Sequence, residues 1–263
     1  MRAPSPYNLS LLFWRVWQRN FTVYRENWKV TFIPPLLEPL LYLLAFGVGF
    51  STLLGRFQFQ GSNMSYLHFI APGLIAINIM NNAFFENTYA SFVRMYYQKT
   101  FDAMMATPLT LEEIITGEIV WGATKSAIAT TIMLAVVSLF GLIAYPSGLL
   151  LIPLAFLGGL AFGAIGMFFT GIVKNIELFN LPVFLFVTPM FLFSGTFFPV
   201  ENLPPWAELL ASILPLTHLV KICRALGWGQ YDLSLLWEGA YFIVFFLIFF
   251  PLAIAKMRKR LMK

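Results

Sequence analysis

The sequence predicts an all-α integral membrane protein with six transmembrane helices, and three observations carry that prediction. Of the 263 residues, 59% are hydrophobic and only 11% are charged, which excludes an ordinary soluble globular protein. Several apolar stretches approach the roughly 20 residues that a helix needs to cross a bilayer. Most charged residues fall between these stretches, so little of the chain is left for a soluble domain.

Residues 1–30 are expected to form an amphipathic helix at the membrane surface. Apolar and aromatic side chains recur there at helical spacing, with basic residues off that stripe. The stripe comprises Leu9, Leu12, Phe13, Val16, Trp17, Phe21, Tyr24 and Trp28. Such a helix suits the lipid interface, either as a plain anchor for the first span or as an anchor that also touches a partner.

Residues 31–263 are expected to form one transmembrane domain. Its predicted spans cover residues 31–54, 66–93, 119–144, 149–173, 178–193 and 235–255. Between spans one and two, residues 55–65 indicate a short polar loop. Glu38 is an acid within span one and hence a functional candidate, but it falls near the start of the predicted span and is interpreted as interfacial.

Span two carries a polar stripe that lipid would not accept. Asn78, Asn82 and Glu86 are spaced four apart, so they lie on one face of the helix. That face is expected to meet protein or a water-filled path. Two roles stay open for it: hydrogen bonding between packed spans, or lining of a transport path.

The segment 94–117 is the longest polar stretch between spans, and it predicts a helix–turn–helix elbow. Residues 99–106 can form a short helix that stops before Pro108. Thr110 and Glu113 have the spacing of a capping box, which opens a second helix. The apolar residues expected to be exposed on this elbow, as a docking surface, are Tyr97, Phe101 and Met105.

Residues 194–229 lie between two apolar runs but cannot form one spanning helix, because several prolines interrupt the hydrogen-bond ladder. Broken backbone at membrane depth is tolerated only inside protein or beside water. Within residues 199–229 we expect two short helices, split at Pro215, that enter the membrane face and return.

Basic residues predict the orientation. With the N-terminus inside, the cytoplasmic Lys and Arg are Arg2, Arg15, Arg19, Arg25, Lys29, Arg94, Lys99, Lys174, Lys256, Arg258, Lys259, Arg260 and Lys263. Only Arg56, Lys221 and Arg224 fall outside, and Lys125 lies within or beside span three. This bias predicts that both termini are cytoplasmic, with the elbow inside and the broken segment on the exit face.

Little in the sequence indicates a catalytic, nucleotide-binding or metal-binding site. No Gly-rich loop matches a P-loop, so no ATP site is expected in this chain. His68 and His218 are far apart and lack metal-ligand spacing, and the single Cys223 excludes an internal disulfide. The net charge of +5 comes from Lys and Arg at span ends and does not indicate nucleic-acid binding. No catalytic, cofactor-binding or metal residues are therefore expected.

Three segments carry a resemblance to a known family. They are PLLEPLLY at residues 35–42 with FGVG at 46–49, TFDAMMATPL at 100–109 with the following Glu113 and Glu118, and SGTFFP at 194–199 with LPPW at 203–206 and LPLTH at 214–218. Together they resemble the membrane subunit of ABC-2 type exporters, the type V exporter class. The run ATKSA at residues 123–127 and the pair Arg94-Met95 bring the chain nearest to the permease of nodulation-type lipo-chitooligosaccharide exporters.

The resemblance implies a homodimer with a separate ATP-binding-cassette ATPase subunit beneath each copy, where ATP and Mg would bind. It implies outward movement of an amphiphilic substrate across a bacterial inner membrane, most nearly a glycolipid or lipo-oligosaccharide; a hydrophobic drug or another lipid is the alternative. Membrane lipid is a further implied partner. The residues implied to couple to the ATPase are Lys99, Phe101, Asp102, Met105, Thr107, Pro108, Glu112 and Glu113. Those implied to form the outer gate are Phe197, Phe198, Pro204, Pro205, Trp206 and His218.

Two other classes of protein stay as alternatives. A stand-alone secondary transporter would show inverted repeats and mid-membrane charges, but no clear repeat is visible and Glu86 is the only strong mid-span acid. A membrane-embedded lipid-modifying enzyme would need a cluster of His, Asp or Glu at one membrane face, and none is apparent. A neighbouring gene for a P-loop protein would favour the exporter.

Overall fold

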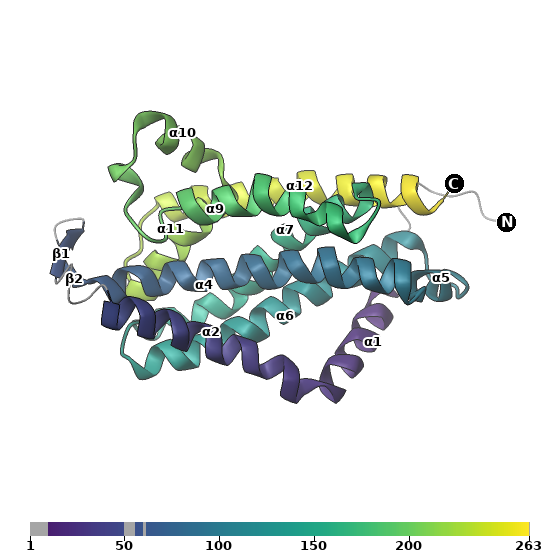
Figure 1. Cartoon of the computed structure of the whole chain (residues 1–263), viewed down its shortest axis with the longest axis horizontal. Helices are drawn as coiled ribbons and strands as arrows, with labels where there is room; N and C mark the ends of the chain where they lie inside the picture. The colour runs from purple at the N-terminus through teal and green to yellow at the C-terminus, as the bar shows by residue number, and fades with distance from the viewer. Residues whose placement is uncertain (1–9, 50–55, 60–61, 263) are drawn as a thin grey trace.

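The computed structural model describes residues 10–49, 56–59 and 62–262, which form a bundle of long helices lying side by side (Figure 1). Six helical stretches in this part of the chain are long and apolar enough to cross a membrane, which confirms the predicted class and span count. They cover Trp28–Phe46, Tyr66–Tyr97, Leu111–Leu139, Ser147–Ile172, Ile176–Phe193 and Ser234–Leu261.

The described elements follow one another in chain order. They are α1 (Phe13–Glu26), α2 (Trp28–Gly49), β1 (Arg56–Phe59), β2 (Ser62–Ser65), α4 (Tyr66–Phe85), α5 (Thr100–Met105), α6 (Leu111–Leu139), α7 (Leu151–Ile172), α8 (Asn180–Pro182), α9 (Thr188–Phe193), α10 (Pro205–Ile213), α11 (Pro215–Trp228) and α12 (Ser234–Leu261). π-Helical turns cover Glu86–Ala90, Val93–Tyr97 and Val183–Val187, and 3-10 turns cover Ser147–Leu150, Ile176–Phe179 and Val200–Asn202.

α4 is the central helix of the bundle, buried along most of its length. It packs against α6, α7 and α11, and in Figure 1 it lies between α2 and α9. The α6–α7 contact is close because Gly159 has no side chain: a Cβ there would lie 2.7 Å from the Cα of Ala123. This packing holds the two helices that flank α4.

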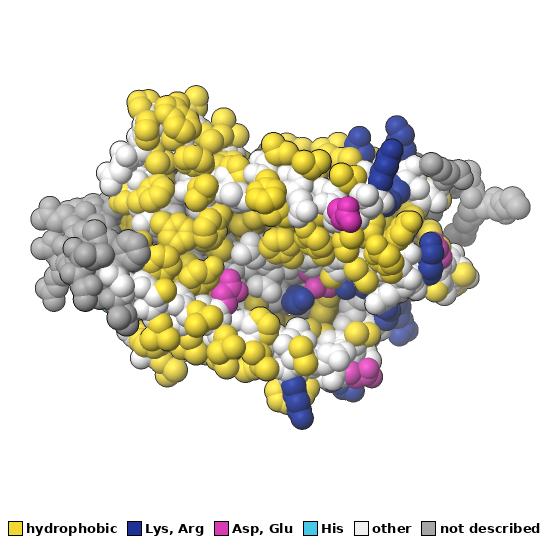
Figure 2. All heavy atoms as spheres, in the orientation of Figure 1, with side chains coloured by type: hydrophobic (Ala, Val, Ile, Leu, Met, Phe, Trp, Pro, Cys, Tyr) yellow, Lys and Arg dark blue, Asp and Glu magenta, His cyan; other side chains and the backbone are white. Residues whose placement is uncertain are grey.

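The two ends of the bundle differ in charge. α1, α5 and the last turns of α12 lie at one end, and Lys and Arg side chains gather near it on the face drawn in Figure 2; we call it the basic end. The opposite end, with β1, β2, α10 and α11, is called the hairpin end. Arg260 of α12 donates to the carbonyls of Thr170 (2.5 Å) and Val173, which satisfies acceptors left free where α7 ends.

Three expectations differ from the structure. Within residues 55–65, expected as a loop, Arg56–Phe59 pairs antiparallel with Ser62–Ser65. Glu38 lies in the middle of its span, not near the end, because α2 already begins at Trp28. Span three, expected to begin at residue 119, is continuous with the second helix of the elbow, because α6 runs unbroken from Leu111.

The broken segment at the hairpin end forms the expected pair of short helices. α10 and α11 are bent by 83° at the Leu214-Pro215 junction. Proline is tolerated at the first position of α11, since the N–H it lacks would have no intrahelical partner there. The predicted pair of short helices split at Pro215 is thereby confirmed, and its re-entrant path through the membrane stays a prediction.

Candidate functional site

The elbow at the basic end is a compact turn between α4 and α6. The helical continuation of α4 ends at Tyr97, and Lys99 then takes up a left-handed backbone conformation (φ 55°), which is uncommon for a residue other than glycine. α5 follows directly, and the Thr107-Pro108 turn leads into α6. The side chains of Lys99 and Asp102 are 66% and 54% exposed and face each other at 3.9 Å.

α5 turns its apolar side into the protein. Phe101 is fully buried and Met104 nearly so, in a cluster shared with Val16 of α1, Ile115 of α6 and Met257 of α12. The expectation that Phe101 is exposed for docking is therefore wrong. The polar pattern of the segment could not show which side of a six-residue helix meets the bundle.

The exposed part of the elbow is less apolar than expected. Tyr97 is exposed as expected, and so are Asp102, Thr107 and Pro108, whereas Met105 is half-buried against the apolar cluster. These residues, together with Lys99, form the surface that α5 offers to a partner. The docking role of this surface stays a prediction.

The capping box at the start of α6 also holds α1. Thr110 Oγ1 accepts from the Glu113 N–H (3.3 Å), and Glu113 Oε2 accepts from the Thr110 N–H (2.8 Å). The other carboxylate oxygen of Glu113 accepts from the N–H (3.2 Å) and hydroxyl of Ser10. Glu112 is also buried and lies 3.9 Å from Arg258 of α12. Both acids thus connect elements of this chain.

α1 approaches α6 closely along the same stretch. A Cβ at Gly117 would lie 2.5 Å from the Cβ of Val16, so only glycine permits this contact. Trp17 Nε1 donates to Thr124 Oγ1 at 2.9 Å. α1, α5 and α6 are therefore packed as one unit at the basic end.

Above this unit lies a buried cluster of charged side chains centred on Glu86. Its carboxylate accepts from Arg94 Nη1 (2.8 Å), Lys125 Nζ (2.7 Å) and Trp121 Nε1 (3.0 Å). The Glu86 side chain is 5% exposed. Ionised groups this deep are retained only when paired and hydrogen-bonded, as they are here.

Glu118 of α6 is the second acid of this cluster and is fully buried. It accepts from Arg94 Nη2 at 2.6 Å, Ser91 Oγ at 2.6 Å and Asn20 Nδ2 at 2.9 Å. Arg94 therefore bridges two carboxylates, and the cluster joins α1, the end of α4 and α6.

The structure separates the three members of the predicted stripe. Glu86 belongs to the charge cluster, whereas the Asn82 amide donates to the Asn78 carbonyl of its own helix (3.0 Å). The Asn78 side chain is buried and makes no hydrogen bond to any described residue. Glu118 was not predicted as a site residue, because its partner Arg94 lies 24 positions away on another helix and no local spacing indicates the pair.

A groove of about 490 Å³ opens beside the charge cluster; we call it the polar groove. Its lining includes Arg19, Tyr24, Glu86, Arg94, Trp121 and Lys125. Figure 2 shows a hollow between α4 and the α1–α2 arm with acidic and basic side chains inside it. Burial lowers the pKa of the Arg19 guanidinium, partly offset by the nearby Glu118 carboxylate.

The six predicted gate residues at the hairpin end divide into two groups. Phe197 is partly buried: its ring lies 4.9 Å from that of Phe191, and its carbonyl accepts from Tyr66 Oη at 3.0 Å. His218 is buried, stacked on Tyr241 at 3.8 Å and bonded to Glu238. The exposed members are Phe198, Pro204, Pro205 and Trp206. The gating role of both groups stays a prediction.

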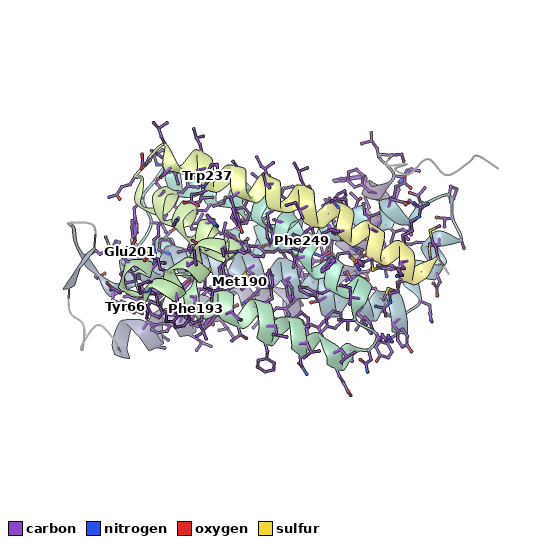
Figure 3. All side chains as sticks on the ribbon, turned by 90° about the horizontal axis from the view of Figure 1, so that it is seen from above. Tyr66, Met190, Phe193, Glu201, Trp237 and Phe249 are labelled. Carbon is purple, nitrogen blue, oxygen red and sulfur yellow. The ribbon has the colours of Figure 1, made fainter. Side chains whose placement is uncertain are left out.

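The loop before α10 is fixed to α11 by Arg224. Its guanidinium donates to the Gly195 carbonyl at 2.6 Å and lies 3.9 Å from the centre of the Phe69 ring. In Figure 3, Tyr66 and Glu201 lie at this hairpin end, while Trp237 projects outward from the start of α12. Within the described residues, no group of three His, Cys, Asp or Glu side chains could hold a metal ion.

These features define a multi-pass helical membrane protein with a short, partly exposed helix at its basic end. The chain belongs to the ABC-2 type transporter family, whose match covers residues 11–227. It is a membrane permease subunit, and membership of this family implies an ATPase partner.

Relatives extend the likeness over nearly the whole chain. Nodulation protein J from Rhizobium leguminosarum bv. viciae is 33% identical over 248 residues, covering 94% of both chains. Nodulation protein J from Rhizobium leguminosarum bv. trifolii is 34% identical over 254 residues, covering 97% of this chain and 95% of the relative. The Inner membrane transport permease YadH from Escherichia coli (strain K12) is 23% identical over 243 residues, with 91% and 93% covered. The resemblance to nodulation-type permeases is confirmed.

Proposed function

We propose that this permease works as a homodimer in a bacterial inner membrane and exports an amphiphile, a glycolipid or lipo-oligosaccharide. The observation that carries the proposal is the likeness to Nodulation protein J, at 33–34% identity over 94–97% of this chain. The substrate comes from the nodulation-type resemblance, since the family alone does not fix it.

Energy would enter through α5. An ATPase subunit bound to the exposed Lys99, Asp102, Thr107 and Pro108 would push on a helix whose other side is locked into the bundle. Because Phe101 packs with residues of α1, α6 and α12, a displacement of α5 would move the basic ends of three helices together. This packing supports α5 as the coupling helix.

The basic end also supports the proposed orientation of the permease in the membrane. Lys and Arg of the described residues gather around α5 and the end of α12, as expected of a cytoplasmic face. The ATPase would then bind from inside, and α10 and α11 would face the exit side.

Reconstitution tests the proposal directly. The chain and the ATPase subunit that co-purifies with it are placed in vesicles, and ATP-driven flux of a fluorescent lipo-oligosaccharide is followed. We expect flux that requires ATP hydrolysis and is lost with a hydrolysis-deficient ATPase. Flux that continues without hydrolysis, or flux of a hydrophobic drug with none of the lipo-oligosaccharide, would overturn it.

A further inference from the structure

The polar groove carries an unbalanced charge. Three cations belong to it and to the cluster behind it, Arg19, Arg94 and Lys125, against two carboxylates, Glu86 and Glu118. Arg94 and Lys125 are paired with these acids, whereas Arg19 makes no ion pair with any described residue and donates only to the Asn20 amide oxygen (2.8 Å). One positive charge is therefore left facing the groove.

A second groove, of about 330 Å³, adjoins the first at Tyr24, which lines both; we call it the apolar groove. Apart from Tyr24 it is lined by Trp28, Phe32, Ile128, Thr131 and Ile132. The Thr131 hydroxyl donates to the Ala127 carbonyl of its own helix (2.8 Å), and no charged side chain is among these lining residues. A positively charged polar groove thus meets an apolar one at a single aromatic ring.

α6 shows the same division along its own surface. Trp121, Lys125, Ile128 and Ile132 follow one another at spacings of four, three and four, so they form one stripe of the helix. Trp121 and Lys125 line the polar groove, and Ile128 and Ile132 line the apolar groove. The stripe changes from charged to apolar away from the basic end, as the head group and acyl chain of a lipid do.

We infer that the two grooves form a capture site for an amphiphile with a negatively charged head group, taken from the leaflet nearer the basic end. Arg19 and Lys125 bind the head group in the polar groove, and the acyl chain lies against Trp28, Phe32 and Ile132. The inference rests on the proposed function, in that the captured amphiphile is the cargo.

Photocrosslinking of the permease–ATPase complex without nucleotide tests the site. The probe is lysophosphatidic acid with a diazirine in its acyl chain, and the comparison is a monoacylglycerol with the same chain and no charge. We expect saturable labelling of peptides containing Phe32 or Ile128–Ile132, at concentrations about tenfold lower for the charged probe, the loss typical of one hydrogen bond to a charged group. Equal labelling by both probes, or labelling elsewhere, would overturn the inference.

Two pairs of variants localise the two halves of the ligand. Arg19→Gln should weaken labelling by about tenfold, while Arg25→Gln, an exposed cation on the same helix, should leave it unchanged. Ile132→Trp should block the apolar groove, whereas Leu139→Trp, an exposed position on α6, should not. If Arg19→Gln and Arg25→Gln reduce labelling equally, the probe is attracted only to the basic surface of α1. That result would contradict a specific binding site.

A loss of probe binding can be distinguished from a loss of transport. Labelling is measured without nucleotide, so a complex that binds the probe but exports nothing would overturn the proposed function alone. Export that persists in a complex without specific labelling would overturn the capture site alone. In preparations with intact export, labelling should fall during ATP turnover; labelling that ATP leaves unchanged would identify a resident lipid and contradict capture of cargo.

Discussion

Arg94 and Glu118 stand 24 positions apart in the chain, yet two guanidinium nitrogens of Arg94 lie 2.9 Å and 2.6 Å from one carboxylate oxygen of Glu118. The pair joins the end of α4 to α6 just above the elbow. Both side chains are largely buried, with 14% and 0% exposed. Such a pair is strongly destabilising when one member alone is removed, because the other is left as a buried charge.

Arg94→Met should lower the free energy of unfolding by about 3–5 kcal/mol, because Glu118 loses its cation and Glu86 loses one of two. Thermal unfolding of the purified permease in detergent measures the change. Arg25→Met, at an exposed position, is the control and should stay within about 0.5 kcal/mol. A loss at position 94 as small as that of the control would contradict the bridging role.

Asp102→Arg should reduce transport per ATP hydrolysed several-fold and leave the unfolding temperature unchanged, because this side chain is exposed on α5. Phe101→Ala should instead lower stability by about 3–5 kcal/mol, as large buried side chains do. The measurements are ATPase activity and flux in the same vesicles. Normal coupling in Asp102→Arg would count against α5 as the docking helix.

Gly117→Ala should destabilise the protein by about 1–3 kcal/mol, since the added Cβ would meet Val16 and force α1 away from α6. Gly239→Ala is the matched control: it is also helical, and a Cβ there meets nothing within 4 Å. Unfolding in detergent compares the two. Equal stability of both variants would show that α1 is not held against α6.

Asn78→Leu distinguishes the two roles left open for the polar stripe. The Asn78 amide is buried without a hydrogen-bond partner among the described residues, so an apolar replacement should raise stability by about 1 kcal/mol. If the amide lines a transport path, flux falls while stability rises. A loss of stability would indicate hydrogen bonding between packed helices instead.

Much of the architecture follows from local sequence. The apolar run lengths predict the six spans, and Thr110 with Glu113 predicts the capping box at the start of α6. The elbow itself is predicted by Pro108, which no helix interior accepts readily. These features depend on residues close together in the chain, so the sequence alone defines them.

Features that depend on distant contacts could not be predicted in the same way. Phe101 is buried because α5 rests on α1, α6 and α12, which no local pattern encodes. Glu86 was recognised as unusual, but its partners Arg94, Trp121 and Lys125 lie 8 to 39 positions away. Gly117 likewise allows the close approach of α1 to α6 through a contact with Val16, which lies more than a hundred positions earlier in the chain.

The unbroken course of α6 has a mechanical consequence. Its 29 residues form a rod about 43 Å long, since each residue adds about 1.5 Å. A tilt of about 10° around its midpoint would shift each tip by about 4 Å in opposite directions, by the same geometry. A small displacement of α6 at Leu111 would thus move the helix at Leu139 directly, without intermediate rearrangements of side chains.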